Sequence, residues 1–385
     1  MHQNFSKENL IYKMVSATKP IKIFFSAIIM LFSFVQFANA QEHGTEKNED
    51  IHQSNQEEKE FSPSELINDH IGDSHEFHIA DWKGHAISMP LPVILWSKNG
   101  LVTFMSSEFH HDNSGVVVVE KNGEKFVRAE EQIYQLNEGE NTIVLDDEES
   151  PKNASKPLDF SITKNVFSML MSSIILLLLF TAVARSYKNN KKAPKGIAGF
   201  LEPLVTFVRD DIAIPNIGEK KYARYMPYLL TVFFFVWINN LIGLVPFFPG
   251  SSNLTGNIVF TGVLAFITFI ITTLSGNKNY WSHILLPPVP KALYPIMIPI
   301  EIIGMFTKPF ALMIRLFANI TAGHIIILSL VSLIFIFKTV AIAPVSAAFV
   351  LFMSVLELLV AALQAYVFTL LSALFIGQAV ADDHH

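Results

Sequence analysis

The C-terminal part of the chain contains apolar runs that are longer than a membrane-spanning helix requires. Residues 293–337 and 345–379 are almost entirely apolar. A helix rises about 1.5 Å per residue, so about 20 residues cross the hydrocarbon core of a bilayer, which is about 30 Å thick. Both runs exceed this length, and each must therefore tilt strongly or break within the membrane.

Helix-breaking residues interrupt the first of these two runs. They are Pro295, Pro299, Gly304 and Pro309. They predict a short helix, a kink and then a long inclined helix. We expect the two long helices to meet as a hairpin near residues 338–344.

Three shorter apolar segments precede the long runs and predict ordinary membrane helices. They lie at residues 162–184, 225–248 and 258–274. The first is followed at once by a cluster of five basic residues, Arg185, Lys188, Lys191, Lys192 and Lys195. Basic residues beside a span mark the cytoplasmic side, so this helix should run from outside to inside. A mixed segment at residues 197–214 carries charges among apolar residues and should lie along the cytoplasmic interface.

The composition agrees with a membrane protein and excludes several other classes. Hydrophobic residues make up 51% of the 385 residues and charged residues only 16%, too apolar for an ordinary soluble protein. The net charge is −6 and no basic stripe is present, so we expect no nucleic-acid partner. Cysteine is absent, which excludes disulfides and thiolate metal sites. No G-x-x-x-x-G-K-S/T motif occurs, so nucleotide chemistry would belong to other chains.

The first forty residues have the pattern of a secretory signal peptide. Lysines precede an apolar run at residues 23–34, and Ala38-Asn39-Ala40 forms a small-x-small cleavage pattern before Gln41. We expect residues 1–40 to be removed, because the apolar run is short for a span; the alternative is an uncleaved first helix. Cleavage places Gln41 outside the cytoplasm, which agrees with the orientation inferred from the basic cluster.

Residues 41–157 read as an exported, polar and acidic segment. Residues 41–60 are charged and Gln-rich, and we expect them to be disordered. Beyond them, short apolar runs between turn residues predict a small β-rich domain with a hairpin turn at Lys121-Asn122-Gly123-Glu124. These runs lie at residues 86–96, 101–105, 116–119 and 126–127. A polar linker at residues 146–156 would lead into a membrane domain at residues 158–385.

Histidines are concentrated in the exported segment, which holds eight of the thirteen. They include His70, His75, His78, His85, His110 and His111. Metal binding is one interpretation, but the spacing matches no tight ligand pattern. We therefore expect solvated polar histidines, with no metal and no cofactor.

Ionisable side chains within the last two apolar runs are few. They are Glu301, Lys308, Arg315, His324 and Glu357. Such groups are costly in a membrane and mark functional positions. Arg315 lies mid-helix, with Asn319 one turn further along on the same face. Because a guanidinium stays charged, it needs water or an anionic partner, either Glu301 or Glu357 of this chain or a carboxylate on another subunit.

Titratable groups lie on both sides of Arg315 along the chain. His324 is nine residues beyond it, about 13 Å along the helix and on the opposite side. Glu357 and Gln364 are seven residues apart and share a face of the other long helix. In a hairpin, His324 and Glu357 can come close and form a proton relay towards the exterior. Glu301 lies on the cytoplasmic side of Arg315.

Together these patterns predict an all-α polytopic membrane protein with about five to six membrane helices. The last two are long and inclined, and a small β-rich exported domain precedes the helices.

Three segments of this sequence resemble one known family. Glu301 with residues 308–324, KPFALMIRLFANITAGH, is similar to the signature helix of ATP synthase subunit a. Glu357 and residues 363–368, LQAYVF, resemble its final helix, and residues 240–246, NLIGLVP, resemble the end of its second span. The resemblance covers about residues 160–380, and the three segments are consistently spaced.

The resemblance implies a proton-translocating stator subunit of an F-type ATP synthase, without a catalytic site of its own. The counterpart of Arg315 faces a ring of c subunits, each with one membrane-embedded carboxylate, and two offset half-channels reach that ring. The residues that would line the exterior half-channel are Asn240, His324, Glu357 and Gln364. Asn319 would lie beside the arginine, and Glu301 would mark the cytoplasmic half-channel.

The same resemblance implies the partners and the location. The partners would be the c-subunit ring, the b subunits of the peripheral stalk, the rest of the F1Fo complex and membrane lipid. The location would be the bacterial inner membrane, with the N-terminal domain outside and the C-terminus in the cytoplasm.

This sequence departs from the family pattern at a few positions. Gly243 stands where many bacterial relatives carry an acid, so the outer half-channel loses one carboxylate. His324 and Glu357 are exchanged relative to some bacterial members, which preserves the chemistry of the pair if the two side chains touch. Ala318 replaces a common glycine.

Two other classes of membrane protein share some of these features. Broken helices and buried charges also suit a secondary transporter or a stand-alone channel, although we find no inverted repeat. A membrane-anchored sensor would use residues 41–157 as its receptor, but we expect no cytoplasmic output domain after Ala379.

Overall fold

The computed structural model describes most of the chain beyond residue 71. The described residues are 72–82, 85–144, 151–189, 196–245, 250, 252–287, 289–337, 339 and 342–381. The expected signal peptide and the expected disordered segment lie outside these ranges. Among the described residues, Ala322–Leu359 belong to one compact unit and the others to a second.

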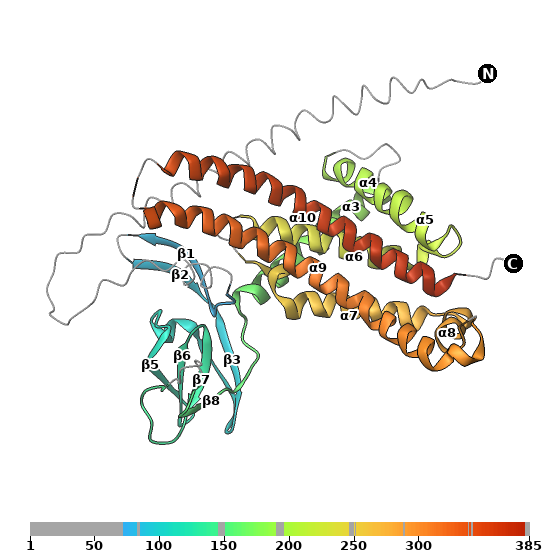
Figure 1. Cartoon of the computed structure of the whole chain (residues 1–385). Helices are drawn as coiled ribbons and strands as arrows, with labels where there is room; N and C mark the ends of the chain where they lie inside the picture. The colour runs from blue at the N-terminus through green and yellow to red at the C-terminus, as the bar shows by residue number, and fades with distance from the viewer. Residues whose placement is uncertain are drawn as a thin grey trace. The chain divides into compact units, whose positions relative to one another are not determined.

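The N-terminal part of the second unit is rich in β-strands (Figure 1). The strands are β1 (Glu76–Trp82), β2 (His85–Pro90), β3 (Pro92–Ser97), β4 (Gly100–Met105), β5 (Ser114–Lys121), β6 (Glu124–Ala129), β7 (Gln132–Leu136), β8 (Ala154–Ser155) and β9 (Leu158–Asp159). They form three antiparallel sheets, ordered β1-β2, β4-β3-β9 and β5-β6-β7-β8. The predicted β-rich domain is therefore confirmed.

The β5–β6 turn has the conformation that its sequence predicts. Asn122 and Gly123 both have positive φ, 53° and 77°, and Lys121 pairs with Glu124. A tight hairpin needs this conformation, which asparagine and glycine adopt at low cost. By contrast, part of the expected polar linker belongs to the sheets, because β8 pairs with β7.

A buried ion pair lies in the β-rich domain. The Arg128 side chain is 1% exposed, and its Nη2 donates to Glu76 Oε1 at 2.7 Å. Burial raises the pKa of the Glu76 carboxyl, but the hydrogen bond and charge of Arg128, together with hydrogen bonds from Ser88 and His111, hold that pKa below its ordinary value of 4.5. His111 and Ser88 add hydrogen bonds to the other carboxylate oxygen.

The expectation that the histidines of this domain are solvated is wrong for one of them. His75 is buried rather than solvated, and its Nε2 contacts Asp159 at 2.8 Å. His110 is exposed, as expected. His70 and the side chains of His78 and His85 lie outside the described part. Within that part, no group of three or more His, Asp and Glu side chains is placed to hold a metal ion.

Hydrogen bonds join the β-rich domain to the first long helix, α3 (Lys164–Asn189). Asp73 accepts from the Thr163 hydroxyl at 2.9 Å and from the Asn165 amide at 3.0 Å, so its carboxylate caps the helix. The Lys164 amide donates to the Ser74 carbonyl at 2.8 Å. The first turn of α3 is thus built into the β-rich domain.

Five helices of the described part are long and apolar enough to cross a membrane. They are α3, α6 (Tyr222–Gly243), α7 (Ile258–Ser275), α9 (Tyr294–Phe337) and α10 (Ala343–Val380). This number agrees with the predicted five to six. The short helix α8 (Lys278–Leu285) follows α7 and is not evident from the hydropathy pattern.

The mixed segment at residues 197–214 is helical, comprising α4 (Ile197–Phe207) and the π-helical turn η2 (Val208–Ala213). The helix α5 (Ile214–Ile217) follows it. Val208 and Ile212 are fully buried and pack in one core cluster with residues of α6 and α10. Arg209 and Asp210 are exposed and pair with each other. The segment therefore buries one apolar face and leaves its charges outside.

The prediction that prolines interrupt the helix of residues 293–337 is wrong. The helix α9 is continuous over 44 residues, and Pro299 and Pro309 lie inside it. Pro295 falls in the first helical turn, where no backbone donor is needed. Each of the other two prolines removes one hydrogen bond, and the remaining ladder of a long membrane helix tolerates this loss.

The expected hairpin of α9 and α10 is confirmed. In the first unit, the Ser346 hydroxyl donates to the Leu330 carbonyl, and His324 contacts Glu357. These pairs show that the two helices run antiparallel there, as Figure 1 also shows.

Candidate functional site

Arg315 lies on an exposed face of α9. Leu312 and Leu316 are 1% exposed and pack in the core cluster, which fixes the rotation of the helix. That rotation leaves Arg315, Ala318 and Asn319 exposed on the other side. The expectation that Arg315 and Asn319 share a face is confirmed.

The Arg315 guanidinium has no hydrogen bond or ion pair with any described residue of its own compact unit. Arg315 and Glu301 belong to the same compact unit and form no ion pair there. A permanent positive charge on an apolar helix without an internal partner leaves water or a second chain to satisfy it.

His324 and Glu357 form a close pair, as their sequence positions predict. His324 Nδ1 lies 3.1 Å from Glu357 Oε1, and their side chains are 15% and 7% exposed. An imidazole and a carboxylate at this distance can pass a proton between them.

Gly323 makes room for this pair. A Cβ atom at position 323 would overlap Glu357 Oε1 and lie 3.0 Å from its Cγ. Only glycine leaves space there for the carboxylate. Neither periodicity nor charge in the sequence points to this role for Gly323.

Asn240 is buried and uses both ends of its amide. Its Nδ2 donates to the Ala361 carbonyl at 3.1 Å, and its Oδ1 accepts from the Thr255 hydroxyl at 2.7 Å. Gln364 is also buried, on α10 one turn beyond Ala361. Thr255 was not evident from the sequence, because it lies in the short 3-10 helix η3 (Leu254–Gly256) after a span.

Glu301 is partly exposed on α9, fourteen residues before Arg315. Fourteen residues of helix correspond to about 21 Å. Along the chain, the two cations Lys308 and Arg315 therefore lie between the carboxylates of Glu301 and Glu357.

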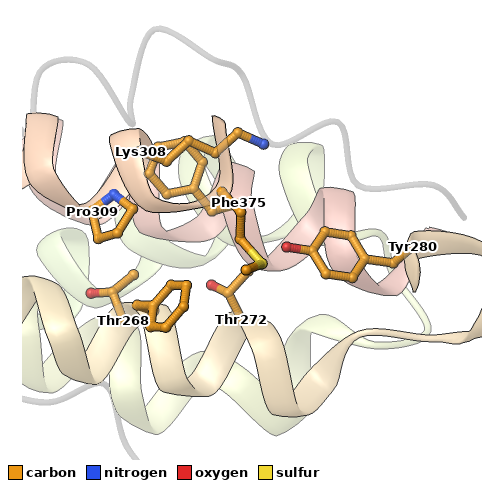
Figure 2. A pocket seen from close by; sticks show the side chains of 8 residues that line it. Thr268, Thr272, Tyr280, Lys308, Pro309 and Phe375 are labelled. Atoms are coloured by element: carbon orange, nitrogen blue, oxygen red, sulfur yellow. The ribbon is translucent and has the colours of Figure 1, made fainter. Parts of the chain in front are cut away.

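A pocket lies beside the part of α9 between Glu301 and Arg315 (Figure 2). It is lined by Thr268, Phe269, Thr272, Tyr280, Met305, Lys308, Pro309 and Phe375. Figure 2 shows the Tyr280 hydroxyl pointing towards Thr272, while the Lys308 ammonium points away from the pocket. Lys308 Nζ donates to Gln378 Oε1 at 2.8 Å and lies 5.7 Å from the centre of the Phe375 ring.

Polar groups in this pocket are available to water. Thr272 Oγ1 is buried and has no hydrogen-bond partner within the described residues. Burial raises the pKa of the Tyr280 phenol, so that side chain stays a neutral donor. A buried hydroxyl without a protein partner is a position where a water molecule is favourable.

Comparison with known proteins identifies the family. A family model described as ATP synthase A chain matches residues 166–377, more than half of the chain. A second, described as a domain of unknown function, matches residues 66–160, the region of the β-strands.

Relatives from several bacteria agree with this match. ATP synthase subunit a of Chloroherpeton thalassium is 52% identical over 241 residues, which cover 61% of this chain and 71% of that protein. ATP synthase subunit a of Chlorobium phaeobacteroides strain BS1 is 50% identical over 243 residues, 61% of this chain and 70% of the relative. That of Myxococcus xanthus is 46% identical over 244 residues, 62% and 79%. The chain therefore belongs to the ATP synthase A chain family, the proton-translocating, non-catalytic subunit of the membrane sector of ATP synthase.

Proposed function

We propose that this chain conducts protons through two half-channels that meet at Arg315, where its guanidinium faces the carboxylates of a c-subunit ring. The observation that carries this proposal is the exposed guanidinium of Arg315, unpaired in the described part of an otherwise apolar helix. Ala318 on the same face has a small side chain, which would let a rotor helix approach closely.

The permanent charge of Arg315 explains how one proton is released. Burial in lipid raises the pKa of a carboxyl group, so the rotor acid travels through the membrane protonated. Beside Arg315 the anion is favoured, and the proton leaves into the inner half-channel. The same fixed charge repels protons and prevents a direct leak between the half-channels.

The exterior half-channel would use Asn240, His324, Glu357 and Gln364. The contact of His324 with Glu357 supports a relay, because an imidazole can accept a proton from one side and release it to a carboxylate. The buried amides of Asn240 and Gln364 support a polar route through the apolar core.

The inner half-channel would begin near Glu301 and reach Arg315 through the pocket lined by Thr272 and Tyr280. The location of this pocket beside α9, between Glu301 and Arg315, supports that route. Each proton that crosses a potential of 100 mV supplies about 2.3 kcal/mol, which would bias the rotation of the ring.

The expected domains and location complete the proposal. Residues 1–40 would be a signal peptide, residues 41–157 an exported domain, and residues 158–385 the membrane domain in a bacterial inner membrane. The five candidate spans among the described residues support opposite sides for the two ends of the membrane domain, with the C-terminus in the cytoplasm. The basic residues after α3 support the same orientation. The b subunits of the peripheral stalk would hold this chain against the ring.

The test is Arg315→Ala in the complete ATP synthase, assayed for ATP-driven proton pumping in inverted membrane vesicles. We expect pumping to be abolished. Arg315→Lys should also be severely impaired, because the compact ammonium group of lysine replaces the planar guanidinium with its several hydrogen-bond donors. Arg209→Ala is the matched control, since it removes an exposed arginine that pairs with Asp210. Wild-type pumping by Arg315→Ala, with the enzyme assembled normally, would refute the proposal.

A further inference from the structure

Most side chains on both faces of the three-stranded sheet β4-β3-β9 are apolar, with exposed Thr103 between Leu101 and Met105. One face supplies Val93, Leu95, Val102 and Phe104 to the core of the β-rich domain. The other face, here called the outer sheet face, carries large exposed apolar side chains. They are Trp96 (55% exposed), Leu101 (56%), Met105 (40%), Leu158 (64%) and Phe160 (62%).

These side chains form one continuous surface because of the strand register. Trp96 of β3 lies opposite Leu101 of β4 on one side and opposite Leu158 of β9 on the other. Phe160 continues the line of β9, since its amide donates to the Ile94 carbonyl at 2.8 Å. A sheet with one face in water normally alternates apolar and polar residues, so this surface is expected to be covered.

The chain connects the outer sheet face directly to the first membrane helix. Phe160 precedes Lys164, the first residue of α3, by four residues, which span at most about 14 Å. The link is ordered, because the Ile162 amide donates to the Pro92 carbonyl at 3.0 Å and the Lys164 amide donates to Ser74. The surface is therefore held close to the level at which α3 enters the bilayer.

The composition of the outer sheet face favours lipid as the material that covers it. Trp and other aromatic side chains are enriched at the interface between headgroups and acyl chains, and an apolar face flanking a span suits the same region. The surface is also continuous along the chain with the exposed apolar side chains of α3, including Leu170, Ile174 and Leu177.

We propose that the outer sheet face docks on the bilayer, inserting Trp96, Leu101, Leu158 and Phe160 into the headgroup region of the leaflet at the N-terminal end of α3. The lipid surface is then a second anchor for the β-rich domain, in addition to its covalent link to α3. This docking depends only on α3 being a membrane helix, so it stands whether or not the proposed route through Arg315 is correct.

The absence of cysteine from the chain makes a direct test possible. Leu101→Cys and Leu158→Cys would each carry a nitroxide spin label in the complete ATP synthase reconstituted into liposomes of bacterial phospholipid. Val116→Cys is the matched control, because Val116 is 71% exposed on β5, in another sheet. Retained ATP-driven pumping would show that each labelled protein is folded.

The readout is the ratio of collisions with oxygen, which dissolves in lipid, to collisions with a water-soluble nickel chelate. We expect this ratio to be severalfold higher for labels at 101 and 158 than for the label at 116. Adding Trp96→Glu to the Leu158→Cys protein should lower the oxygen-to-nickel collision ratio of the label at 158 to that of the control. A charged side chain next to the label disfavours insertion of the outer sheet face into lipid.

Three outcomes would overturn docking on lipid. Equal ratios at the three positions would show that the outer sheet face is in water. Protection of the labels at 101 and 158 from both reagents would show that protein covers the surface, either another subunit, a second copy or another segment of this chain. An unchanged ratio in the Trp96→Glu protein would show that the apolar side chains do not hold the surface in lipid.

Discussion

Replacing Gly323 with alanine should break the contact between His324 and Glu357 without changing any charge. A Cβ at position 323 would overlap Glu357 Oε1 and would lie 3.0 Å from Cγ and 3.1 Å from Cδ. Ordinary contacts between such atoms are about 3.5–4.0 Å, so the carboxylate must withdraw by about 1 Å. The present separation from His324 Nδ1 is 3.1 Å, and the added displacement places it beyond hydrogen-bonding distance.

The size of the effect follows from the strength of that contact. A hydrogen bond that involves a charged group contributes about 1.5–3 kcal/mol. If the proton passes through this pair, the rate should fall about ten- to a hundredfold, since about 1.4 kcal/mol corresponds to a factor of ten. Alanine favours the helix by about 1 kcal/mol relative to glycine, so a loss of activity would not arise from a weaker helix.

The assay is ATP-driven proton pumping in inverted vesicles, normalised to the amount of assembled enzyme. Gly304→Ala is the matched control on the same helix, because a Cβ there meets no atom within 4 Å. Adding Glu357→Asp to the Gly323→Ala protein should restore part of the rate, since the shorter side chain withdraws from the new methyl group. Equal pumping by Gly323→Ala and Gly304→Ala would refute the requirement for the close pair.

Three further predictions concern other parts of the molecule. Arg128 holds the pKa of Glu76 in the folded domain below 4.5, so the ion pair stabilises the β-rich domain at pH values above 4.5. This stabilisation is lost as the pH falls through the pKa that Glu76 has in the folded domain. Glu76→Gln should therefore destabilise the domain at pH 7 by about 3–5 kcal/mol and flatten its pH dependence, measured by limited proteolysis of the full chain between pH 3 and 7. Thr255→Val should slow proton pumping severalfold by leaving the Asn240 amide oxygen buried without its donor, whereas Thr255→Ser should retain the hydrogen bond and the rate. Gly377→Ala should reduce assembly of the chain, measured by its abundance in membranes, because a Cβ there would overlap a backbone carbonyl of α5.

The sequence predicted those features that depend on one segment at a time. Apolar length located the membrane helices, since a bilayer of fixed thickness demands a minimum run of residues. The isolated charge of Arg315 predicts a functional position, because an ionised group in lipid is costly wherever the rest of the chain lies. The hairpin turn at Asn122 and Gly123 followed from their tolerance of positive φ.

The pairing of His324 with Glu357 was predictable for a related reason. Two long helices joined by a short connection must pack antiparallel, so residues at similar distances from the turn come close. These two residues lie 33 positions apart and meet at 3.1 Å. The prolines of α9 were misleading because the preference of one residue was overridden by the remaining hydrogen bonds of a 44-residue helix.

The tertiary structure alone decided which side chains complete the site. The Thr255 hydroxyl donates a hydrogen bond to Asn240, which lies 15 residues earlier in the sequence. Gly323 has no side chain and therefore leaves space for the Glu357 carboxylate. The rotation of α9 that buries Leu312 also leaves Arg315 exposed, without a partner among the described residues of its own compact unit. Hydropathy and propensity are properties of one segment, whereas these contacts depend on the relative rotation and spacing of packed helices, which many side chains set together.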